Sequence, residues 1–192
     1  EETPVVVAQY ETTIWINELH YLGEDQGANF QYVEIVGPVG TVLSGNYRLE
    51  FYDGSTRSLY NAINLFGRLS DDPTTGAQGT GRGLSAQTIT GTTIRTGFGV
   101  FTNGASGNDN DGPANAIALV DLNTGAVSQF ISYQGSAGTE FGVGTDGKAL
   151  DGTATGLVPT PMGVNEVPTN PNGNEESLQL QGTGLEIHQF RW

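Results

Sequence analysis

The chain has 192 residues, contains no cysteine, and carries a formal net charge of −14 from 7 basic and 21 acidic residues. This length suits a single domain, and a hydrophobic content of 36% is enough to form one core. The composition excludes disulfide frameworks, thiolate metal sites and cysteine nucleophiles, and no apolar run is long enough to predict a membrane-spanning helix.

Alternation of apolar and polar residues predicts β-strands along most of the chain. Helical periodicity is scarce because glycine interrupts almost every window, and the best helical candidate is the short stretch 58–66, which contains Asn61 and Asn64. The predicted strands, in chain order, are 14–19, 30–36, 48–52, 93–101, 116–122, 126–133, 177–181 and 185–192.

The clearest local unit is the stretch 117–131, in which two strand-like runs flank a short turn that contains Asn123 and Gly125. This pattern predicts a β-hairpin, because these residues tolerate the positive φ that tight turns need. Asp-Gly or Asn-Gly pairs occur six times in all, and such frequent turns between short strands predict an antiparallel sandwich or barrel. In that fold we expect burial of Ile14, Ile16, Val33, Ile35, Leu119, Phe130 and Leu180.

Two stretches have the composition of loops, namely 71–83 and 135–174. The second is long for an irregular stretch of a compact domain, so we expect part of it to pack on the sandwich or to serve a function. The chain shows no internal repeat, and we expect one domain over 13–192 after an N-terminal extension, 1–12. No signal peptide is recognisable, but the abundance of Asp, Asn, Thr and Gly beside a single lysine is typical of a secreted protein.

Catalytic motifs are weak. There is no Gly-x-Ser-x-Gly element, and the glycine-rich run 79–83 lacks the spacing of a phosphate-binding loop. His20 and His188 could each act as a base, but serine, histidine and an acid occur together by chance in most chains of this length. We therefore expect the chain itself not to be an enzyme.

Oxygen-rich clusters make calcium the one cofactor that the sequence indicates. Asp109 and Asp111 alternate with asparagines before a turn glycine, which suits a hard cation, although the spacing is not that of an EF-hand and a solvated turn is the alternative. A second set comprises Glu18, Glu24, Asp25 and Glu34. Alternation places Glu18 on the side of Ile14 and Ile16, and Glu34 on the side of Phe30 and Tyr32, so an inward-facing acid needs a cation, an arginine or backbone amides.

Direct binding of DNA is not expected without cations. The stretch 48–95 holds five arginines and four acids, whereas the remaining chain holds only Lys148 and Arg191 against 17 acids. The middle of the chain is therefore less repulsive than the rest, but it is not a basic patch.

Several short motifs occur in an order that resembles the lamin tail domain of secreted bacterial proteins. The chain departs from the family pattern at Leu22 and Gln31, where members often have acidic residues. The motifs are the run 16–21 (INELHY), the run 32–38 (YVEIVGP), the run 43–47 (LSGNY), the pair 117–121 (IALVD) and 129–135 (QFISYQG), and the closing runs 177–182 (SLQLQG) and 190–192 (FRW).

This resemblance implies an all-β fold, an immunoglobulin-like antiparallel β-sandwich with long irregular loops. It also implies a non-catalytic accessory domain of a secreted bacterial protein, of the kind found beside extracellular nucleases of the endonuclease/exonuclease/phosphatase type. Its partner would then be a neighbouring hydrolase domain or an extracellular ligand. The alternative is a stand-alone, calcium-assisted binding domain for a cell-surface polymer or protein.

Overall fold

The structure, a computed structural model, describes residues 14–21, 31–69, 82–88, 113–133, 140–166, 177–182 and 187–192. Within these ranges the chain is built from β-strands, with one 3₁₀ turn and no α-helix, so the predicted all-β class is confirmed. None of the described segments forms a helix with the length and apolar character needed to cross a membrane.

The first sheet has four strands in the order β5-β2-β1-β9. β1 lies at its centre, antiparallel to β2 on one side and to β9 on the other. The strands are β1 (Trp15–His20), β2 (Tyr32–Pro38), β5 (Arg82–Thr88) and β9 (Leu178–Gln179).

The second sheet has five strands in the order β4-β3-β6-β7-β8. All its neighbours are antiparallel except β7 and β8, which run parallel over two residue pairs. The strands are β3 (Tyr47–Tyr52), β4 (Leu59–Asn64), β6 (Asn115–Asp121), β7 (Ala126–Tyr133) and β8 (Thr160–Pro161).

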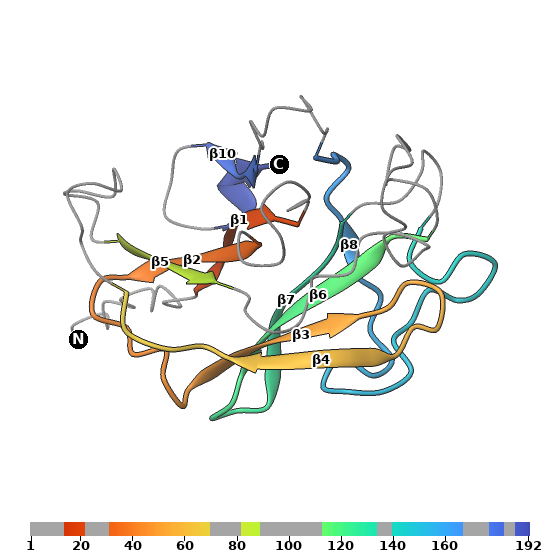
Figure 1. Cartoon of the computed structure of the whole chain (residues 1–192), viewed down its shortest axis with the longest axis horizontal. Coiled ribbons are helices and arrows are strands. Elements are labelled where there is room, and N and C mark those ends of the chain that lie inside the picture. The colour runs from red at the N-terminus through yellow and green to blue at the C-terminus, as the bar shows by residue number, and fades with distance from the viewer. Residues whose placement is uncertain are drawn as a thin grey trace, which may run out of the picture.

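The two sheets face each other across the main hydrophobic core, which makes the molecule a β-sandwich (Figure 1). Alternation sends every second side chain of the inner strands into this core. The seven residues predicted to be buried are all at most 8% exposed, so that prediction is confirmed. The largest fully enclosed side chains include Trp15, Tyr21, Tyr52, Tyr133 and Phe51.

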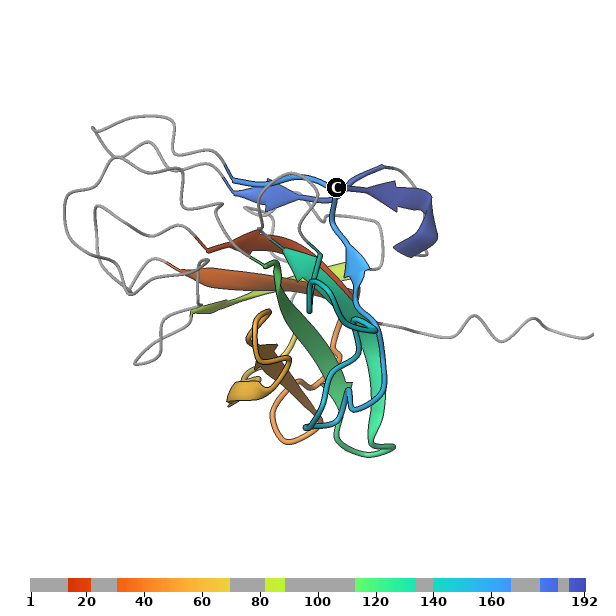
Figure 2. The same ribbon diagram turned by 90° about the vertical axis from the view of Figure 1, so that its right-hand side faces the viewer.

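A C-terminal segment covers the outer face of the four-stranded sheet (Figure 2). It comprises β10 (Gln181–Gly182), a 3₁₀ turn (Ile187–Gln189) and β11 (Phe190–Arg191). Ile187, Phe190 and Trp192 pack there on a small cluster formed by Trp15, Val36 and Leu180. In the described part of the predicted strand at 185–192, a 3₁₀ turn is therefore followed by a two-residue strand.

The predicted hairpin at 117–131 is confirmed, since β6 pairs with β7 from Asn115 and Tyr133 down to Asp121 and Ala126. The Asp121 carboxylate accepts hydrogen bonds from the backbone N–H groups of the following turn, and Gly125 closes the turn at φ 70°.

Two local expectations were wrong. The helical candidate 58–66 is strand β4, because pairing with β3 at the sheet edge overrides a weak local signal. The backbone of Arg82 and Gly83, predicted to be loop, begins strand β5. The predicted strand at 93–101 and the N-terminal extension lie outside the described residues.

The segment 140–166 contains only the short strand β8, and it packs on the outer face of the five-stranded sheet (Figure 2). Phe141, Ala149 and Ala154 join a cluster there with Tyr52 and Phe130 of that sheet. The expectation that part of the irregular stretch packs on the sandwich is therefore confirmed for these residues.

Candidate functional site

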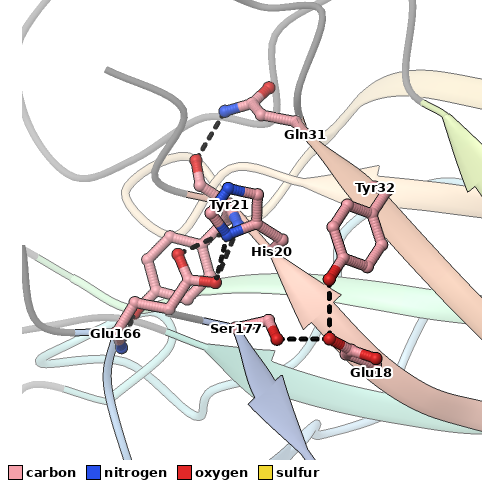
Figure 3. Close-up of polar contacts among 7 residues, drawn as sticks. All are labelled: Glu18, His20, Tyr21, Gln31, Tyr32, Glu166 and Ser177. Atoms are coloured by element: carbon pink, nitrogen blue, oxygen red, sulfur yellow. Dashed lines mark hydrogen bonds and ion pairs between the residues drawn. The ribbon is translucent and has the colours of Figure 1, made fainter. Parts of the chain in front are cut away.

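A polar face at one end of the four-stranded sheet gathers most of the predicted site residues that the structure describes (Figure 3). A β-bulge between Ile16 and Glu18 shifts the register of β1 by one residue. As a result Leu19, and not Glu18, continues the inward side begun by Ile14 and Ile16. The predicted orientation of Glu18 was therefore wrong: it lies on the outer face, directly opposite Glu34 of β2.

Glu18 and Glu34 each have their own hydrogen-bond donors. The Tyr32 hydroxyl donates to Glu18 Oε1 at 2.6 Å, and the Ser177 hydroxyl donates to the same oxygen. The side-chain amide of Asn17, the bulged residue, donates to Glu34 Oε1 at 2.7 Å. No arginine takes part in these contacts, and the donors are hydroxyl and side-chain amide groups. A cation, an arginine or backbone amides were expected only for an inward-facing acid, and both of these acids face outward.

Burial and a neighbouring charge change how this face titrates. Burial raises the pKa of Glu34, the hydrogen bond from Asn17 lowers it, and the Glu18 carboxylate raises it again, with a net rise above its usual value. Burial also raises the pKa of Tyr32 to about 12, reinforced by its hydrogen bond to Glu18. Glu34 therefore binds a proton more readily than an isolated glutamate does.

Of the predicted calcium ligands, the described residues include only Glu18 and Glu34. Asp25, Asp109 and Asp111 lie outside the described residues, as does Glu24, so the structure brings together only Glu18 and Glu34 of the predicted set. Within the described ranges there is no group of three or more acidic or histidine side chains arranged to hold a metal ion. The calcium site at Asp109 and Asp111 stays a prediction.

Next to the carboxylate pair, His20 and Glu166 form a buried contact that ties β1 to the segment 140–166 (Figure 3). His20 Nδ1 lies 3.1 Å from Glu166 Oε1, and the two residues are 4% and 1% exposed. The Tyr21 backbone N–H donates to both carboxylate oxygens at 3.1 and 3.0 Å, and the Glu166 N–H donates to the Tyr21 hydroxyl at 2.8 Å. The imidazole of His20 is thus held inside the fold by a carboxylate.

Gln31 completes this cluster, since its side-chain amide donates to the Tyr21 carbonyl at 2.5 Å. His188, the other candidate base, is exposed on the 3₁₀ turn, and its carbonyl accepts a hydrogen bond from Arg191 at 2.9 Å.

A second buried carboxylate, Glu50 of β3, fixes the other half of the segment 140–166. Glu50 is fully buried, pairs with Arg48, and accepts hydrogen bonds from the Tyr52 hydroxyl at 2.5 Å and from Thr153. The Thr153 N–H and hydroxyl donate at 2.9 and 2.8 Å, and the Ala154 N–H donates to the Tyr52 hydroxyl at 3.0 Å. Burial raises the pKa of Glu50, but the hydrogen bonds from Tyr52 and Thr153 and the charge of Arg48 together outweigh this effect. The pKa of Glu50 therefore lies below its usual value.

The sequence reasoning missed both Glu50 and Glu166. Glu50 sits at a regular outward position of a predicted strand, and nothing local indicates that a loop about a hundred residues later covers it. Glu166 follows a proline-containing irregular stretch that carries no motif. Their only signal was the expectation that the long stretch packs on the sandwich.

The segment 140–166 leaves a cavity of about 320 Å³ beside the end of β7 and β8. Several large apolar side chains of the same segment are exposed around it, among them Val143 at 52% and Val158 at 58%. The cavity is lined by Ser132, Glu140, Phe141, Gly142, Val143, Gly144, Thr145, Asp146, Gly147, Val158, Pro159 and Pro161.

The arginines of the middle of the chain do not form an open basic surface in the described part. Arg48 is paired with Glu50, Arg57 with Asp146 at 2.6 Å, and Arg68 donates to the Gly40 carbonyl at 2.9 Å. Tyr52, which lies near Arg48 in the sequence, is fully buried in the Glu50 network and offers no ring face to a base. These contacts leave the described arginines engaged within the fold.

Comparison with protein-family models, with curated proteins and with solved structures gave no match to this chain. The resemblance to the lamin tail domain therefore stays a prediction from the motifs, and the site has to be interpreted from its own geometry.

Proposed function

We propose that the chain is a non-catalytic accessory domain of a secreted bacterial protein, and that it serves recognition or positioning beside a hydrolase such as an extracellular nuclease. The ordered motifs that resemble the lamin tail domain support this proposal, and the β-sandwich fold agrees with it. The fold alone does not imply a function, so the argument depends on one feature of the surface.

That feature is the fixed segment 140–166. Two buried carboxylates hold it at separate points, Glu50 through Thr153 and Glu166 through His20 and Tyr21. A long loop that is held in one conformation pays little entropy when a partner binds, because its backbone is already ordered. The segment also exposes large apolar side chains, since Leu150 and Leu157 are 54% and 43% exposed.

Such apolar side chains on a rigid loop are typical of a surface that meets another protein. His20 contacts the Glu166 carboxylate and is enclosed within the fold, which is typical of a histidine with a structural role. The domain would therefore contribute contact surface, while the chemistry would belong to its neighbour.

The proposal is tested on the parent protein with and without this domain. If the domain serves recognition, its deletion raises KM for the macromolecular substrate several-fold and leaves kcat on a small chromogenic substrate unchanged. The isolated chain should show no turnover of DNA, RNA, esters or phosphodiesters. Purified-chain turnover that disappears in His20→Ala or His188→Ala would overturn the proposal, and a parent without a hydrolase would favour the stand-alone binding domain.

A matched pair of surface variants assigns the effect to the segment. Leu150→Ser plus Leu157→Ser changes two exposed apolar residues of the segment, whereas Val39→Ser plus Val42→Ser changes two exposed apolar residues outside it. Only the first pair should reproduce the rise in KM, with melting temperatures close to that of the original protein. Equal effects of the two pairs would contradict a recognition role for the segment.

A further inference from the structure

The cavity beside β7 and β8 has a nearly buried polar residue in its lining. Ser132 of β7 is 5% exposed, and it lies on the same face of the strand as Phe130, two residues before it. Phe130 packs against Phe141, which also lines the cavity, so this face of β7 is the one directed toward it. The Ser132 carbonyl accepts a hydrogen bond from the Met162 N–H at 2.9 Å.

The Ser132 side chain makes no hydrogen bond to another described residue, and its hydroxyl is not a fully enclosed group. Ser132 lines the cavity, so its hydroxyl is open to a group placed there. A ligand that offers a donor or an acceptor at this position would bond to the hydroxyl without displacing a protein partner. The Ser132 hydroxyl thus provides a hydrogen-bonding position in the cavity that does not depend on the charged residues of the lining.

The charged groups of the lining favour a cation. Among the described lining residues, Glu140 and Asp146 are ionisable and none is basic. Asp146 is already paired with Arg57 at 2.6 Å and lies 3.6 Å from the Lys148 ammonium. Glu140 is exposed and has no ion-pair partner among the described residues. In a chain of net charge −14, the local and the overall charge both attract a basic group.

Part of the lining is aliphatic, since Val143, Val158, Pro159 and Pro161 belong to it. Among the described lining residues Phe141 is the only aromatic one, and at 3% exposure it offers no open ring face for a sugar or a base. The volume is at the lower limit of small-molecule sites, which begin at about 300 Å³. It suits one side chain better than a drug-sized ligand or a length of polymer.

We propose that this cavity binds a basic side chain, lysine or arginine, presented by a protein partner. The aliphatic stem lies against the valine and proline walls, and the cationic head donates to the Glu140 carboxylate and to the Ser132 hydroxyl oxygen. Long basic side chains bury their stems in this way while the charged head keeps polar contacts. The inference rests on the proposed recognition role and adds to it the class of group that is recognised.

The test is an NMR titration of the ¹⁵N-labelled chain with four capped amino acids. N-acetyl-arginine methylamide and N-acetyl-lysine methylamide carry the basic side chains, norleucine has the lysine stem without its charge, and glutamate has the opposite charge. We expect the two basic compounds to shift the amide signals of Ser132 and of 142–147 with millimolar dissociation constants. Norleucine should bind at least about tenfold more weakly, and glutamate should cause no shift in these signals.

Three variants assign the contacts. Glu140→Gln should weaken binding of the basic compounds about tenfold, and Ser132→Ala should weaken it several-fold without loss of folding, since only an unpaired hydroxyl is removed. The control Asp121→Asn makes the same change of charge at the turn between β6 and β7, outside the cavity, and keeps an acceptor for that turn. It should leave the dissociation constants unchanged.

Two results would overturn the inference: equal affinity for norleucine and lysine compounds, or equal weakening by Glu140→Gln and Asp121→Asn. The first would mean an apolar cavity without charge selection, and the second only attraction to an acidic chain. Because the titration uses the isolated chain, its failure leaves the deletion experiment on the parent protein unaffected. A failed deletion experiment, in turn, leaves measured binding of the basic compounds in place.

Discussion

Glu18 of β1 and Glu34 of β2 are direct cross-strand partners, so two carboxylates stand opposite each other on the outer face of the four-stranded sheet. Like charges in this arrangement destabilise a sheet, whereas opposite charges stabilise it. The hydroxyls of Tyr32 and Ser177 and the amide of Asn17 compensate part of the repulsion. Burial is the main cause of the raised pKa of Glu34, and the Glu18 carboxylate adds to it.

Glu34→Gln should therefore stabilise the protein at neutral pH. A folded-state pKa above the unfolded value means that the folded protein holds a proton that the unfolded chain has lost. This contribution to stability is complete below the unfolded pKa and is lost as the pH rises through the raised folded pKa. We expect the variant to gain about 0.5 kcal/mol at pH 7, in line with cross-strand pairs, and less at pH 4.

Urea unfolding at the two pH values measures this difference, with Glu140→Gln as a control that removes an exposed charge outside the pair. A gain that is the same at pH 4 and pH 7 would show that protonation of Glu34 is not its cause.

Tyr52→Phe should loosen the attachment of the segment 140–166 without disturbing the sheet. The variant keeps the ring, which packs on Phe130, but removes the hydroxyl that donates to Glu50 and accepts from the Ala154 N–H. We expect a loss of about 1–2 kcal/mol, because a buried carboxylate and a buried N–H each lose a partner. Hydrogen exchange should accelerate at Ala154 and stay unchanged at the β3–β6 pairs; equal acceleration at both would mean global destabilisation only.

Two glycines of the same segment separate backbone strain from steric contact. Gly152 and Gly156 both have positive φ, 70° and 79°. A Cβ at Gly152 would lie 2.4 Å from the Tyr52 hydroxyl oxygen, whereas nothing lies within 4 Å of a Cβ at Gly156. Gly156→Ala should therefore cost about 1 kcal/mol from strain alone, and Gly152→Ala should cost about 1–3 kcal/mol more because Tyr52 must move.

Thermal unfolding of the two alanine variants tests this ranking. If both variants lose the same amount, the contact between Gly152 and Tyr52 does not hold the segment in place.

Calcium should raise the melting temperature more than magnesium at the same millimolar concentration, if Asp109 and Asp111 bind it. The two carboxylates are one residue apart and can reach one ion while Gly112 lets the backbone turn. Bound calcium stabilises the folded state by mass action once its concentration exceeds the dissociation constant. Asp109→Ala plus Asp111→Ala should remove most of the difference. Equal shifts with calcium, magnesium and sodium of matched ionic strength would mean screening alone.

Alternation made much of the core predictable, because it depends only on neighbours in the sequence. Val33 and Ile35 of β2 are buried in the main core as expected, and so is Leu119 of the hairpin. Phe130 is buried too, but on the outer face of its sheet, by the segment 140–166. The face of Glu18 was not predictable by the same rule, since one bulged residue, Asn17, reverses the alternation after it. Strand β4 gave no clear signal because pairing at an edge, and not its asparagines, decides its conformation.

The buried carboxylates were not predictable for a different reason. Glu50 meets Thr153, which is 103 residues away, and Glu166 meets His20, which is 146 residues away. Pattern rules compare residues within one element, so they cannot show that a distant loop supplies the donors that make a buried charge tolerable.

The position of β1 also constrains the order in which the protein can fold. β1 lies between β2 and β9, and its His20 and Glu18 side chains bind Glu166 and Ser177, which lie 146 and 159 residues further along the chain. The hairpins β3–β4 and β6–β7 need only nearby residues and can form first, whereas contacts between distant residues form slowly. During synthesis β1 leaves the ribosome before the other described strands, yet it is among the last to acquire all its partners, and any chain that stops before Ser177 leaves one edge of β1 open to pairing with another molecule.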